Sequence, residues 1–95
     1  MIVENIALKN GTAIGLKFEL QKAPLILINA NKGFVMCGYL NMDVAERLGD
    51  IACKVSGVSN FDEVLDAEVI ELTENARQMG IHTGMNGKEA LERMF

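Results

Sequence analysis

The sequence has few of the residues that would point to a secreted, disulfide-bonded or metal-binding protein. Its 95 residues include no Trp, one Pro, one His and two Cys. Two cysteines do not make a disulfide framework, so both thiols are expected to be reduced, which favours a cytoplasmic location. A structural zinc site usually takes four Cys or His ligands, and the chain offers only Cys37, Cys53 and His82 at irregular spacings. No metal and no cofactor is therefore expected.

Long hydrophobic runs and an excess of positive charge are also absent. The longest nearly apolar stretch, Ala23 to Ala30, is far shorter than the ~20 residues of a membrane helix. The N-terminus has no basic start and no long apolar segment, so no secretory signal is expected. Nine Lys and Arg stand against 13 Asp and Glu, and the net charge of -4 would repel a phosphate backbone. Neither a membrane nor a nucleic acid is expected as a partner.

What the chain has in abundance is apolar residues. It is 49% hydrophobic with a mean hydropathy of +0.17. A chain of this length forms one domain (1–95) with one core and buries only roughly 60 to 65% of the surface that its unfolded form exposes. Sharing apolar surface between copies would add stability, so a homo-oligomer is expected.

The first 40 residues predict a β-rich region. Ile2 to Leu8 reads as a strand, and Asn10-Gly11 offers the positive φ angles of a tight hairpin turn. From Ile14 to Lys22 apolar and polar residues alternate, which predicts a strand with one apolar face. That face carries Ile14, Leu16, Phe18 and Leu20. We expect it to be the oligomer interface, covered in part by another subunit.

A second hairpin is predicted directly after the first. Leu25 to Ile28 lacks polar alternation, which favours a central strand covered on both faces. The turn Asn31-Lys32-Gly33, with Gly33 in the left-handed conformation, then leads to a strand over Phe34 to Tyr39. Residues 1–40 are thus predicted to form an antiparallel sheet.

Residues 41–95 change to a mixed, more helical pattern. Asn41 can cap a helix over Met42 to Leu48, and strands are predicted over Ile51 to Val55 and Val69 to Leu72. The further helix caps expected from local chemistry are Ser59 with Asp62, Thr73, and Asn86 with Glu89. The predicted fold class is α+β: an antiparallel sheet in the N-terminal half, with short helices and one or two further strands in the C-terminal half.

Several segments taken together resemble the YunC-like family, a domain of unknown function found in bacteria and archaea. They are Ala23-Pro24-Leu25, Gly33-Phe34-Val35-Met36-Cys37-Gly38-Tyr39-Leu40, Gly57-Val58, Gly80-Ile81, Gly84-Met85 and Glu89-Ala90-Leu91. The resemblance implies a β-rich N-terminal region used for tetramerisation and a more helical C-terminal half. It implies no known activity.

Two residues are candidates for catalysis. Cys37 is expected at a strand end before Gly38, where a thiolate could face a cleft, although a buried Cys in a strand is the simpler interpretation. His82, the one histidine, could serve as a base or lie on a solvated loop. A nucleophile and base pair would need the two side chains within hydrogen-bond reach of each other.

The turn before the last predicted helix is a candidate anion site. Gly84, Asn86, Gly87 and Lys88 precede or open that helix, whose free N–H groups can hold an anion. The simpler interpretation is a turn followed by a helix cap, because the residues do not match a phosphate-binding loop. At most a weak phosphate site is expected there.

Three functions remain open from the sequence. The favoured one is a homo-oligomeric binding or scaffolding module. The second is an enzyme acting on a small metabolite at an intersubunit site that uses Cys37, with or without His82. The third is weak anion binding at Gly84 to Lys88. Whether the protein is an enzyme is not decided by its sequence.

Overall fold

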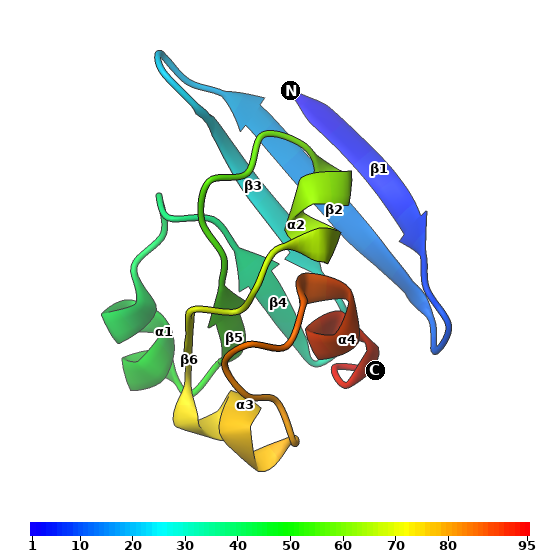
Figure 1. Cartoon of the computed structure of the whole chain (residues 1–95), viewed down its shortest axis with the longest axis vertical. Helices are drawn as coiled ribbons and strands as arrows, with labels where there is room; N and C mark the ends of the chain where they lie inside the picture. Colours follow the sequence, from blue (N-terminus) through cyan, green and yellow to red (C-terminus); the bar gives the residue numbers. More distant parts are fainter.

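The computed structural model describes all residues, 1–95, as one six-stranded sheet with four short helices (Figure 1). The strands are β1 (Ile2–Ala7), β2 (Thr12–Glu19), β3 (Pro24–Asn29), β4 (Gly33–Met36), β5 (Ile51–Lys54) and β6 (Glu71–Leu72). The helices are α1 (Met42–Leu48), α2 (Phe61–Asp66), α3 (Glu74–Gln78) and α4 (Gly87–Glu92). These elements confirm the predicted α+β class.

The strands lie in the sheet in their order along the chain, from β1 to β6. Neighbouring strands pair antiparallel except β4 and β5, which are parallel. The chain returns from the end of β4 to the start of β5 through α1, as a parallel pair requires. Sequence reasoning placed both strands but did not predict their parallel pairing.

Two predicted turns have a different backbone from the one expected. Neither Asn10-Gly11 nor Gly33 has a positive φ angle. Gly33 instead opens β4, where a β-carbon would collide with the backbone carbonyl of Ile51 on the neighbouring strand. Close approach of the two parallel strands, rather than a left-handed turn, is therefore what requires glycine at this position.

Most of the apolar core lies between one face of the sheet, here called the covered face, and the helices α2, α3 and α4. Figure 1 shows α2 and α4 side by side over the sheet. The buried side chains of this core include Ile26, Ile28, Val35, Cys53 and Val55 from the strands and Val64, Ala76, Leu91 and Met94 from the helices and their ends. Phe61 of α2 lies close to the backbone of β2 at Gly15, where a β-carbon would collide with the Phe61 ring.

Helix α1 packs on the opposite face of the sheet, but only over β4 and β5. Its residues Met42 and Ala45 form a small second cluster with Met36 and Ala52. No helix covers the same face over β1, β2 and β3. We call this uncovered part the open face, and by strand register its apolar side chains are Val3, Ile14, Leu16, Phe18, Leu25 and Leu27.

Candidate functional site

The open face carries apolar side chains from three neighbouring strands. The strand register sets Val3, Leu16 and Leu27 in one cross-strand row. Ile14 is 51% exposed and Phe18 is 48% exposed, while Leu16 and Leu27 are partly buried. Of the four residues predicted for an oligomer interface, Ile14, Leu16 and Phe18 thus share this surface. Leu20, also exposed, lies just beyond the end of β2.

Charge is distributed unequally between the two sides of these strands. The charged residues of β1, β2 and β3 are Glu4, Lys17 and Glu19. Strand alternation places all three on the same side as Ala13 and Gly15, which is the covered face. The open face of these strands therefore has no charged side chain.

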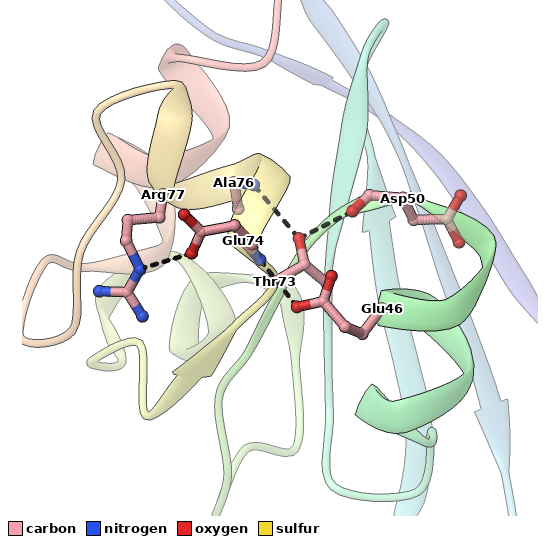
Figure 2. Close-up of polar contacts among 6 residues, drawn as sticks. All are labelled: Glu46, Asp50, Thr73, Glu74, Ala76 and Arg77. Atoms are coloured by element: carbon pink, nitrogen blue, oxygen red, sulfur yellow. Dashed lines mark hydrogen bonds and ion pairs between the residues drawn. The ribbon is translucent and has the colours of Figure 1, made fainter.

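A polar cluster joins α1, β5 and α3 at the sheet end opposite the β4–α1 loop (Figure 2). The Thr73 hydroxyl donates to the Asp50 carbonyl at 2.7 Å and accepts the N–H groups of Ala52 and Ala76, both at 3.2 Å. Glu46 accepts the Glu74 N–H at 2.9 Å. Thr73 is fully buried, and no buried side-chain nitrogen or oxygen in the chain lacks a partner. The buried hydrogen-bonding groups of the cluster are therefore all paired, and the cluster caps α3 and links it to α1 and β5.

Cys37 follows β4 and lines a cavity of about 430 Å³. The side chain is 4% exposed, and its Sγ accepts the Ile26 N–H at 3.3 Å. The cavity wall comes from Ala23 and Pro24 at the start of β3, from Gly38 and Tyr39 after β4, and from Ser56, Gly57, Val58 and Ser59 after β5. Cys37 is thus nearly buried, as in its simpler interpretation, and also borders a cavity.

Cys53 provides a contrast within the same sheet. It lies in β5 under the helices, is fully buried and lines none of the cavities. Burial raises the pKa of its thiol to about 12, because the core would not solvate the thiolate. Both cysteines are free thiols. Cys53 is a core residue, whereas Cys37 faces space that a ligand can occupy.

His82 does not share the Cys37 cavity. It is exposed on the loop between α3 and α4, and its Nδ1 lies 2.9 Å from the Thr83 carbonyl oxygen. None of the cavity walls includes it. A single chain therefore does not assemble the two residues at one cavity, and a catalytic pair would need His82 from another copy.

At the predicted anion site, backbone N–H groups already donate hydrogen bonds within the chain. Asn86 caps α4 by accepting the Glu89 N–H at 2.8 Å, as expected from the capping pattern. The N–H of Gly87 donates to the Ala67 carbonyl, and that of Gly84 donates to the Val69 carbonyl. Lys88 is exposed, and none of these residues lines a cavity. The turn acts as a connection that holds α4 against the rest of the domain.

These features define a class: a small α+β domain with one helix-covered sheet face, one open apolar face and a cavity beside a nearly buried thiol. The chain belongs to the family described as a domain of unknown function, DUF1805, whose model matches residues 36–94. This confirms the family resemblance found in the sequence.

Two relatives support the assignment. The chain is 36% identical over 89 residues to the uncharacterised protein YunC of Bacillus subtilis strain 168, covering 88% of this chain and 85% of YunC. Its structure is similar to the crystal structure of a protein of unknown function, TA1206 from Thermoplasma acidophilum. That match has a TM-score of 0.94 and 34% identity, and it covers 99% of this chain and 92% of the other.

Sequence reasoning missed the second wall of the Cys37 cavity. In the sequence, Ser59 was predicted only as a helix cap, and Gly57-Val58 was noted only as a segment that carries the family resemblance. The cap of α2 is Asn60, which accepts the Glu63 N–H at 2.8 Å, while the Ser59 N–H donates to the Glu63 carboxylate at 2.7 Å. The local signal was Gly57, which has a φ of 72° and follows a strand closely.

Proposed function

We propose that this protein is a homo-oligomeric module whose copies associate through the open face, with the tetramer as the expected assembly. The observation that carries the proposal is the absence of charge from that face over β1, β2 and β3. Soluble surfaces normally intersperse apolar and charged side chains, and a contiguous apolar patch marks an interaction surface. A second copy offers a matching apolar surface, which no charged partner would.

The geometry of the face suits a contact between two sheets. Side chains from β1, β2 and β3 form parallel rows, and sheets that pack face to face interdigitate such rows about 10 Å apart. Helix α1 stands on the same side over β5 and bounds the surface at one end. Two related copies can therefore bury the same residues against each other, as a twofold interface requires.

The proposed role of the assembly is to act as a binding or scaffolding unit in the cytoplasm. Cys37 and Cys53 are both free thiols, and free thiols persist in reducing compartments. No helix in the structure is long and apolar enough to cross a membrane.

Sedimentation velocity at micromolar concentration tests the proposal with one substitution on the open face. We expect the natural protein to sediment as an oligomer and Phe18→Asp to sediment as a folded species of lower mass, because an unpaired charge is costly in an apolar contact. Circular dichroism confirms that the variant keeps its secondary structure.

Ile70→Asp serves as the matched control. Ile70 is 49% exposed, about the same as Phe18, but lies beside β6 at the far edge of the sheet. It should leave the sedimentation coefficient unchanged. A natural protein that sediments as a monomer, or a Phe18→Asp variant that assembles normally, would refute the proposed interface.

A further inference from the structure

The Cys37 cavity lies at the one place in the sheet where two parallel strands end together. After β4 the chain passes to α1, which packs with Met36 and Ala52 on one side of the sheet. After β5 it passes to α2, whose Val64 packs with Cys53 on the other side. The loops that leave these adjacent strands therefore diverge to opposite faces. In open parallel α/β sheets the carboxyl ends of such diverging strands border a crevice where ligands bind, and β4 and β5 form one such parallel pair.

The lining of the cavity is rich in hydrogen-bond donors and has no charged side chain. Tyr39, Ser56 and Ser59 contribute hydroxyl groups, and Cys37 contributes its thiol. In the cavity wall, the backbone N–H groups that donate to no atom of the chain are those of Ala23, Gly38, Tyr39, Ser56, Gly57 and Val58. Donors in such number fit a ligand that supplies oxygen atoms as acceptors.

The size and the apolar part of the wall limit the ligand further. A cavity of about 430 Å³ is within the range of small-molecule sites. Pro24 and Val58 are both buried residues of the wall and offer apolar surface to a carbon skeleton. The site thus combines hydrogen-bond donors suited to oxygen acceptors with an apolar surface that makes up the larger part of the wall.

We propose that this cavity binds a small monocarboxylic acid. Its carboxylate oxygens accept hydrogen bonds from the N–H and hydroxyl groups after β4 and β5, and its short carbon skeleton lies against Pro24 and Val58. One negative charge suits the lining, because N–H donors stabilise an anion without a cation. A phosphate or dicarboxylate would carry a second charge, and the wall has no cationic side chain to balance it.

This inference goes beyond the proposed assembly and does not depend on it, because a single chain supplies the whole wall. Cys37 gives the site a built-in reporter, since a bound ligand would cover its thiol. Cys53 is an internal control, because its burial and its raised pKa make it unreactive at neutral pH whether or not the cavity is filled.

The test measures alkylation of Cys37 by iodoacetamide, followed by mass spectrometry of the intact natural protein and its peptides. The probes are butyrate and benzoate, with the isosteric neutral amides butyramide and benzamide as controls. We expect a carboxylate at ten times its Kd to slow Cys37 alkylation by about tenfold, because only the unliganded fraction reacts. The amides should protect much less, and Cys53 should stay unmodified throughout.

An NMR titration of the same protein locates the bound acid. The amide resonances expected to shift and saturate are those of Gly38, Tyr39, Ser56, Gly57 and Val58. Gly38→Leu should abolish both protection and shifts by filling the cavity. A β-carbon at Gly38 meets no atom within 4 Å, so it would collide with no part of the fold. Thr83→Leu, which adds the same side chain to an exposed loop, should change neither.

Three results would overturn the inference. The first is no protection and no saturable shift with either acid at about 50 mM, well above the millimolar Kd of even a weak site. The second is equal protection by acids and amides, which would show that the site does not select a carboxylate. The third is saturable shifts that fall on other residues. The NMR result on the natural protein holds even if Gly38→Leu fails to fold.

Discussion

The two faces of the sheet show that the same strand can be apolar on both sides for different reasons. On β2 the covered face holds small residues, Ala13 and Gly15, because Phe61 of α2 packs directly above them. The open face of the same strand holds Ile14, Leu16 and Phe18, which meet no helix. On β2, therefore, the large apolar side chains lie on the exposed side and the small ones face the core. The space left by the helices decides which side chains are buried.

The largest difference between the faces should appear in a matched pair of truncations. Ile28 is fully buried on the covered face, whereas Ile14 on the neighbouring strand is half exposed on the open face. Ile28→Ala should lower the free energy of unfolding of the subunit by about 2 to 5 kcal/mol, since it removes buried methyl groups and leaves a cavity. Ile14→Ala should instead weaken assembly.

Urea unfolding over a range of protein concentrations separates these effects. The loss in Ile28→Ala should be similar at every concentration, while the loss in Ile14→Ala should shrink as concentration rises. If Ile14→Ala lowers stability as much as Ile28→Ala and without concentration dependence, the open face is part of the subunit core instead of an interface.

A smaller effect is expected at the cap of the helix that closes the covered face. Asn86→Ala removes the acceptor for the Glu89 N–H and should cost about 1 kcal/mol in the free energy of unfolding. Assembly should be unaffected, because α4 lies opposite the open face. Thermal unfolding together with sedimentation checks both statements, and a variant as stable as the natural protein would exclude a capping role.

The smallest expected effect is the pH dependence of stability that follows if water does not reach the Cys53 thiol on the covered face. The folded-state pKa of its thiol, about 12, is above the usual value of 9.0, so the folded state holds its proton more tightly than the unfolded state does. The resulting stabilisation is complete below pH 9 and is lost as the pH rises toward 12. Between pH 9 and pH 10 the loss should be on the order of 1 kcal/mol or less.

The measurement compares the pH dependence of unfolding in the natural protein with that of Cys53→Ala. The substitution lowers stability at neutral pH, but it should flatten the decline above pH 9, since the titrating thiol is gone. Cys37→Ala, measured in parallel, controls for removing a thiol as such. Identical slopes in the natural protein and Cys53→Ala would mean that water reaches the Cys53 thiol.

Elements set by neighbouring residues were predictable from the sequence. Asn41, Thr73 and Asn86 each cap the helix expected of them, because a cap joins atoms only two or three residues apart. The helix Met42–Leu48 has the predicted bounds. The cap at Ser59 was wrong by one residue, since Asn60 offers the competing side-chain oxygen. Strand ends shifted by a few residues for a different reason: pairing partners, rather than the local pattern, decide where a strand ends.

The amino-acid sequence by itself determined the family, the α+β class, the caps and the apolar alternation of the β2 region. Only the tertiary structure decided that β4 and β5 are parallel, that Ala13 and Gly15 face the core, and that Cys37 meets Ser56 to Ser59 at a cavity. Apolar periodicity and helix capping depend on residues within one strand or one helical turn, so a short stretch of sequence is enough to predict them. Strand partners, the buried face and the cavity depend on contacts between distant segments, and these are settled only when the whole core packs.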